Sequence, residues 1–138
     1  MFKNLNFIVV GLVLLFSSQA LACGMGEATD AGYENASLAH AYKHWSQGEQ
    51  TKIPFVFVDV RTPAEYKQGH IPGAINIPVS EIEEHLNELP KDKQVYVYCR
   101  SGHRAGKAST ILAKAGFNVE NIPESMNGWT AAGYPVEK

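Results

Sequence analysis

Residues 95–99 are the stretch that most constrains how this chain folds. Their alternating valine and tyrosine side chains favour an extended backbone, and the run ends on Cys99. After a short loop, residues 105–115 are rich in helix-forming residues, and Gly116 behind them suits a helix C-terminus. The pattern predicts that Cys99 lies at the turn between a buried strand and a helix.

The turn that follows Cys99 is expected to bind anions. The first N–H groups of a helix lack partners within the helix, and the helix dipole adds partial positive charge there. Arg100 and Arg104 place two guanidinium groups near the thiol. Both effects stabilise a thiolate, so we expect the pKa of Cys99 to fall well below its ordinary value of about 8.5. The sequence therefore predicts a nucleophilic sulfur in an anion-binding loop.

Apolar runs and turn residues predict that strands and helices alternate along the chain. Residues 55–60 are almost entirely apolar, as in strands that are buried on both faces of a parallel sheet. Ser80 and Glu83 have the spacing of a capping box, which predicts that a helix starts there. We expect strands over residues 55–60, 74–77, 95–99 and 117–122, and helices over residues 35–45, 63–68, 80–89, 105–115 and 125–132. This alternation predicts an α/β fold with a central parallel sheet flanked by helices on both faces.

Length and charge exclude several classes of protein. The 138 residues suffice for one domain with a hydrophobic core. A formal net charge of -2 argues against general attraction to nucleic acid. His40 and His44 lie one helical turn apart, but no Cys, Asp or Glu nearby completes a ligand set, so we interpret them as solvated surface histidines. We therefore expect a monomer with no metal, no cofactor and no nucleic-acid partner.

Residues 1–22 have the pattern of an export signal. Lys3 supplies the positive start, residues 7–16 are an apolar run, and the Ala-Leu-Ala sequence at 20–22 suits a signal peptidase. The apolar run is shorter than the roughly 20 residues that a membrane-spanning helix needs. We therefore expect cleavage before Cys23 and export of the mature chain, in a bacterium to the periplasm.

Cys23 leaves several interpretations open. It resembles the lipidated cysteine of a bacterial lipoprotein, although that signal prefers leucine three positions earlier, where this chain has Ala20. An oxidising compartment also favours pairing of Cys23 with Cys99, but a structural disulfide does not need the cations and N–H donors around Cys99. Attachment to a membrane is expected only through a lipid on Cys23. Residues 23–32 then read as a flexible lead-in and residues 33–138 as the folded domain.

Four motifs of the chain resemble those of a single-domain rhodanese. They are DVRTPAEY at residues 59–66, GHIPGAINIP at residues 69–78, CRSGHR at residues 99–104, and GW with GYPV within residues 128–136. The motifs occur in the family's order and span nearly the whole mature chain. One departure is the pair Glu124 and Ser125, where many relatives carry two glycines shortly before the tryptophan.

The resemblance implies a sulfurtransferase with Cys99 as the catalytic nucleophile. The Cys99 thiolate would take the outer sulfur of a small anionic donor such as thiosulfate, release sulfite and hold the sulfur as a persulfide. Cyanide, a thiol or a protein would then accept that sulfur. Converging backbone N–H groups would stabilise the anion, and the two arginines would orient the donor. The expected substrate-binding residues are Arg100, Ser101, Gly102, His103 and Arg104.

Two other functions compete with sulfur transfer. Cysteine-dependent phosphatases place five residues between cysteine and arginine, whereas four separate Cys99 from Arg104, so we expect this loop to be too small for a phosphate. A relay module that passes sulfur or oxidising equivalents to a protein partner without free turnover is the other alternative.

Three polar residues near the predicted crevice have structural interpretations. Asp59 and Arg61 come at the end of a buried strand, and we expect them to form an ion pair or hydrogen bonds that shape the crevice wall. His70 lies in a tight turn between Gly69 and Ile71, and we expect it to brace that turn.

Overall fold

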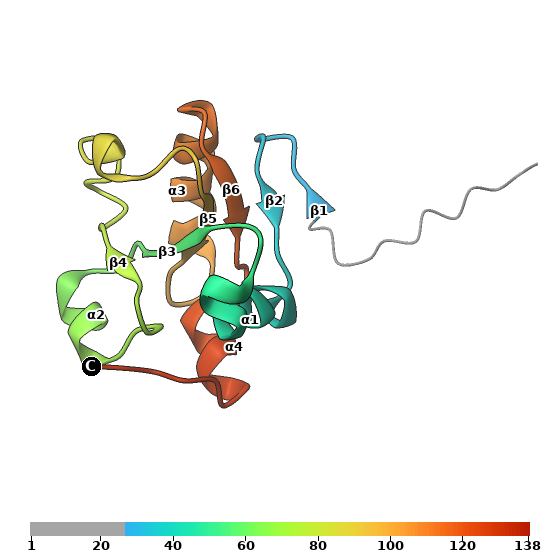
Figure 1. Cartoon of the computed structure of the whole chain (residues 1–138). Helices are drawn as coiled ribbons and strands as arrows, with labels where there is room; N and C mark the ends of the chain where they lie inside the picture. Colours follow the sequence, from blue (N-terminus) through green and yellow to red (C-terminus); the bar gives the residue numbers. More distant parts are fainter. Residues whose placement is uncertain (1–26) are drawn as a thin grey trace, which may run out of the picture.

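The computed structural model describes residues 27–138, so the predicted export signal and Cys23 lie outside the described residues. Its strands form one six-stranded sheet in the order β1-β2-β6-β5-β3-β4 (Figure 1). The pair β1 and β2 is antiparallel, and the other neighbouring pairs are parallel. The strands are β1 Glu27–Ala28, β2 Glu34–Asn35, β3 Phe55–Asp59, β4 Ile75–Asn76, β5 Gln94–Tyr98 and β6 Asn118–Asn121.

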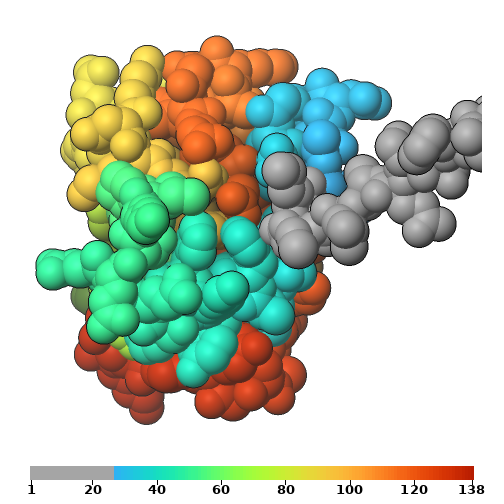
Figure 2. All heavy atoms as spheres, turned by 45° about the vertical axis from the view of Figure 1, so that its right-hand side comes forward, coloured from blue at the N-terminus to red at the C-terminus, as the bar shows by residue number. Residues whose placement is uncertain are grey.

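Helices cover both faces of this sheet, which confirms the predicted α/β fold. The α-helices are α1 Leu38–Gln47, α2 Pro63–Gln68, α3 His103–Lys114 and α4 Ser125–Ala131, and η1 Gly48–Gln50 and η2 Leu86–Glu88 are 3₁₀-helices. Val95 and Val97 of β5 pack in one core cluster with α3. Tyr96 and Tyr98, on the opposite face, pack in a second cluster with α1 and α4. Figure 2 shows α1 lying directly against the C-terminal segment.

Local signals place α2 where the sequence predicts it. Thr62 caps the helix and forms a reciprocal capping box with Glu65, and Pro63 occupies the first turn, where its missing N–H costs nothing. The start of α1 differs from the prediction, because Asn35 pairs with Asn121 in the sheet and Ser37 caps the helix instead.

Two very short strands were missed at the N-terminal side. Residues Glu27–Ala28, within the expected flexible lead-in, form β1 and pair with β2 across a turn that contains Gly32 at φ 86. Two residues are too few to show an alternating pattern, so only their pairing identifies these strands.

The helix predicted from Ser80 does not form. The segment instead makes successive turns in which several N–H groups donate to the carbonyl three residues earlier, as from Glu84 to Glu81 and from His85 to Ile82. The like charges of Glu81 and Glu84 repel at helical spacing. Burial of Ile82 at 0% exposure and Leu89 at 6% decides the path of the segment.

Replacing Ser109 with Ala is expected to stabilise the protein. Ser109 lies on α3 with 0% exposure, and its hydroxyl has no hydrogen-bond partner within the described residues. Alanine removes this unpaired polar group and is the better helix former, so the free energy of unfolding should rise by about 1 kcal/mol. Urea denaturation measures the change, and a loss of stability would contradict the prediction.

Replacing Glu120 with Gln is expected to remove a loss of stability at high pH. Burial, and then repulsion by neighbouring Glu34, raise the pKa of Glu120 from 4.5 to about 7, while Nε2 of His40 lies 3.5 Å from its Oε2. Because the folded pKa is the higher one, ionisation favours the unfolded chain, and the cost grows as the pH rises from about 4.5 to about 7.

Urea unfolding at pH 5 and at pH 8 tests this prediction. The stability of the glutamine variant relative to wild type should improve by on the order of 2 kcal/mol between the two pH values. An equal difference at both pH values would contradict it.

Candidate active site

Cys99 lies where the sequence predicts it, directly after β5 and just before α3. The residue is 1% exposed and forms no disulfide within residues 27–138. Gly102 caps α3, so the turn from strand to helix consists of residues 99–102, which we call the Cys99 loop. The loop is fastened to α4, because the N–H groups of Met126 and Asn127 donate to the carbonyls of Cys99 and Arg100 at 2.9 and 3.0 Å.

Backbone amides surround the sulfur of Cys99. The N–H of Gly102 donates to Sγ at 3.0 Å, and the hydroxyl of Ser125 lies 3.8 Å from it. Burial raises the pKa of the thiol, but hydrogen bonds, chiefly from the amides of Ala105, Gly102 and Ser101, outweigh it. The pKa of Cys99 is therefore lowered, as the sequence predicts, and amides rather than guanidinium groups are the main cause of the lowering.

Gly102 is the residue that lets the loop close. Its φ of 104 lies in the region that favours glycine, and a Cβ there would meet the Pro123 carbonyl oxygen at 2.3 Å. No side chain fits between the loop and the segment after β6, so the amide of Gly102 reaches the sulfur only because the residue is glycine.

Arg104 makes an ion pair across the site. Its guanidinium donates to both carboxylate oxygens of Glu65 on α2, at 2.8 and 2.9 Å. Hydrogen bonding from Arg104 lowers the pKa of Glu65 to about 2. Arg100, in contrast, is exposed and forms no ion pair within residues 27–138. Binding of the donor by Arg100 and Arg104 stays a prediction. Of the two, Arg100 is the one whose guanidinium has no carboxylate partner among the described residues.

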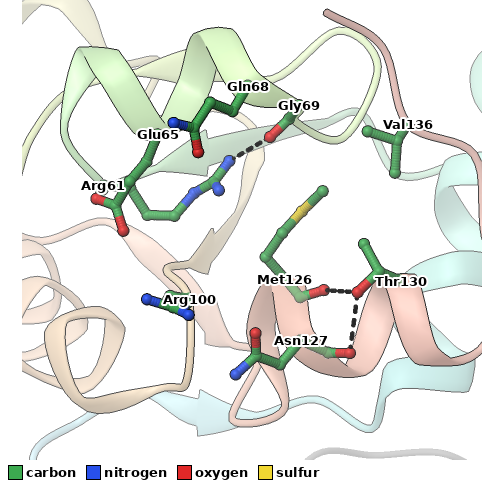
Figure 3. Close-up of a pocket in the computed structure, with 9 residues that line it drawn as sticks. All are labelled: Arg61, Glu65, Gln68, Gly69, Arg100, Met126, Asn127, Thr130 and Val136. Atoms are coloured by element: carbon green, nitrogen blue, oxygen red, sulfur yellow. Dashed lines mark hydrogen bonds between the residues drawn. The ribbon is translucent and has the colours of Figure 1, made fainter.

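A pocket of about 350 Å³ adjoins the Cys99 loop between α2 and α4 (Figure 3). Arg100 contributes positive charge to its wall, whereas Arg61 and Glu65 there are paired with Asp59 and Arg104. Figure 3 shows the Met126 side chain projecting between the two helices. Its lining residues are Arg61, Glu65, Gln68, Gly69, Arg100, Met126, Asn127, Thr130 and Val136. The size and charge suit a small anion.

The expected ion pair between Asp59 and Arg61 is present. Asp59 is 0% exposed, and its carboxylate accepts from Nε of Arg61 at 2.9 Å and from Nη2 at 2.6 Å. The same Nη2 donates to the Gly69 carbonyl at 2.7 Å. These bonds hold Arg61 rigidly in the pocket wall.

His70 braces its turn, as predicted. Its Nδ1 lies 2.9 Å from the Tyr66 carbonyl oxygen and its Nε2 lies 3.1 Å from a carboxylate oxygen of Glu137. The imidazole also stacks on the Tyr66 ring, with centroids 3.6 Å apart. These contacts tie the C-terminal segment to α2.

Two other predicted site residues lie on a different surface, and their part in donor binding stays a prediction. Ser101 and His103 are exposed and line a separate groove of about 690 Å³.

The interpretation of His40 and His44 as solvated surface residues is wrong, because both are half-buried and His44 Nδ1 lies 2.7 Å from the Tyr96 hydroxyl. Among the described residues there is no cluster of three or more potential metal ligands.

Within residues 27–138 no helix has the length and apolar character that crossing a membrane requires.

Ser125 belongs to the site but was not predicted to be part of it. In the sequence it stands out only as a departure from a motif, because 26 positions separate it from Cys99.

Comparisons with known proteins agree with this fold. The family model for the rhodanese-like domain matches residues 38–132. The chain is 40% identical over 82 residues to a sulfurtransferase of Allochromatium vinosum, which covers 59% of this chain and 77% of that protein. It is 44% identical over 68 residues to the thiosulfate sulfurtransferase PspE of Escherichia coli, which covers 47% of this chain and 65% of that protein.

The solved structures include a rhodanese-related protein from Thermoplasma volcanium. It matches with a TM-score of 0.68 at 31% identity, covering 76% of this chain and 98% of that one. Across six curated relatives, the matched part spans from 37% to 77% of the relative's length.

Proposed function

The chain belongs to the rhodanese-like domain family, and on that basis we propose that it is a thiosulfate sulfurtransferase that carries sulfur on Cys99. Relatives named as sulfurtransferases support sulfur transfer in general. The observation that carries the specific proposal is the short bond from the Gly102 amide to the Cys99 sulfur, beside a pocket with an uncommitted arginine.

In the first half-reaction the Cys99 thiolate attacks the outer sulfur of thiosulfate. A bond forms between the two sulfur atoms, the sulfur–sulfur bond of thiosulfate breaks, and sulfite leaves with that electron pair. The terminal sulfur of the persulfide carries the negative charge that the thiolate brought. Arg100 in the pocket wall suits the sulfonate group of the donor, because a guanidinium binds oxyanions through paired hydrogen bonds.

In the second half-reaction an acceptor attacks the terminal sulfur. Cyanide leaves as thiocyanate and the bonding electrons return to Cys99 as thiolate. The same amides that stabilise the thiolate then stabilise the leaving group, since fixed donors do not have to reorganise during the reaction. A thiol or a protein serves as acceptor in the same way, and export would bring the enzyme to acceptors outside the cytoplasm.

Mass spectrometry of the full chain after incubation with thiosulfate tests the proposal. We expect the peptide that contains Cys99 to gain the mass of one sulfur, and cyanide to remove it with release of thiocyanate. Failure to form the persulfide would contradict the proposal. A persulfide that only a protein can discharge would favour the relay alternative, and turnover of an aryl phosphate would favour the phosphatase.

A further inference from the structure

Ser125 has an unusual backbone for a residue with a side chain. Among residues 27–138 it is the only non-glycine residue with a positive φ, at 50. It is 1% exposed and stands at the first position of α4. A side chain in this conformation is unfavourable relative to glycine, so an interaction of the side chain must compensate.

The hydroxyl of Ser125 forms hydrogen bonds to the backbone of Cys99 and to the backbone of Ile122. Its Oγ accepts the Cys99 N–H at 3.1 Å and donates to the Ile122 carbonyl at 2.8 Å. The Cys99 sulfur lies 3.8 Å from the same oxygen. A hydroxyl has one proton, so it serves only one of these two acceptors at a time.

The carbonyl of Ile122 does not depend on that proton. It also accepts the backbone N–H of Ser125 at 3.0 Å, so it keeps a partner if the hydroxyl turns away. The Cys99 N–H holds the serine oxygen in place while its proton changes direction. A charged acceptor forms the stronger hydrogen bond, so ionisation of the sulfur attracts the proton.

We propose that Ser125 is a positioning residue whose hydroxyl proton turns from the Ile122 carbonyl to the Cys99 sulfur when that sulfur is a thiolate or a persulfide. The inference rests on the proposed function of Cys99. Ser125 thereby adds a side-chain donor to the backbone amides of the Cys99 loop. It lies at the start of α4, which the N–H groups of Met126 and Asn127 fasten to that loop.

The test measures the pH dependence of Cys99 alkylation by iodoacetamide in the full chain, followed on the peptide that contains Cys99. Ser125→Ala and Ser125→Gly both remove the hydroxyl, and glycine adopts the observed φ without strain. We expect the midpoint to rise by about one pH unit in both variants. Ser109→Ala, which removes another buried hydroxyl on the opposite side of the sheet, should leave it unchanged.

The rate of thiocyanate formation gives a second readout. At a pH below the alkylation midpoint of the wild type, both Ser125 variants should form thiocyanate about tenfold more slowly than the wild type. At a pH well above the midpoints of all three proteins, the variants should approach the wild-type rate. A purely structural role would slow them at every pH. A folded glycine variant with the wild-type midpoint would overturn the proposal.

The two proposals fail in different ways. If the wild-type chain forms no persulfide but the midpoint still rises in the Ser125 variants, the sulfurtransferase assignment fails and the role of Ser125 stands. If the wild type transfers sulfur and the glycine variant matches its midpoint and its rate, the role of Ser125 fails and the function stands.

Discussion

Replacing Cys99 with Ser is expected to abolish thiocyanate formation from thiosulfate and cyanide, by roughly 10⁴-fold or more. A serine hydroxyl stays protonated near neutral pH and forms no persulfide, so both half-reactions lose their carrier. The donors around the position, including the Gly102 amide at 3.0 Å, stabilise an anion that serine does not supply.

The serine variant should fold like the wild type, because oxygen replaces sulfur at a buried site with hydrogen-bond donors already in place. Its urea unfolding midpoint should therefore stay close to that of the wild type. Ser109→Ala is the matched control, since it alters another buried small residue and should keep full activity. A serine variant with appreciable turnover would exclude a persulfide on Cys99.

Replacing Gly102 with Ala is expected to have the second largest effect, combining a loss of activity with a loss of stability. The new Cβ would stand 2.3 Å from the Pro123 carbonyl oxygen, at a φ of 104 that alanine rarely adopts. The loop must then open and withdraw its amide from the Cys99 sulfur. Loss of one such donor reduces kcat by about 10²-fold to 10³-fold, and the strain costs about 2 to 4 kcal/mol.

Gly133→Ala is the matched control for this prediction. Gly133 also has a positive φ, 74, but a Cβ there would meet nothing within 4 Å. The control should lose about 1 kcal/mol of unfolding free energy from the backbone conformation and keep its activity. Steady-state kinetics and urea unfolding of the two variants separate the effects. Equal behaviour of the two would show that contact with Pro123 does not shape the site.

The elements predicted correctly are those with strong local signals. The apolar run of β3, the tyrosine-valine alternation of β5 and the capping residues of α2 each act through neighbours in the chain. The segment from Ser80 also carries a local helix signal, yet burial of Ile82 and Leu89 overrides it. A weak local preference loses to packing when a segment is short.

The site likewise combines residues that the sequence predicts with partners that the sequence does not reveal. Arg104 is predicted to bind the donor, which stays a prediction, and the structure adds an ion pair with Glu65, 39 positions earlier. His40 and His44 were predicted to face solvent, but they pack against Tyr96 of β5. Neither partner is visible as a pattern, because a charge or a hydroxyl distant in sequence gives no periodic signal.

The sequence by itself determined that a cysteine follows a buried strand and precedes a helix, since strand and helix preferences act over a few adjacent residues. That suffices to predict an anion-binding loop. Only the tertiary structure decided which groups reach the sulfur and which of the two loop arginines has no carboxylate partner among the described residues. Those contacts join residues brought together by the packing of α2, α3 and α4 around the ends of the strands, and packing depends on the whole chain at once.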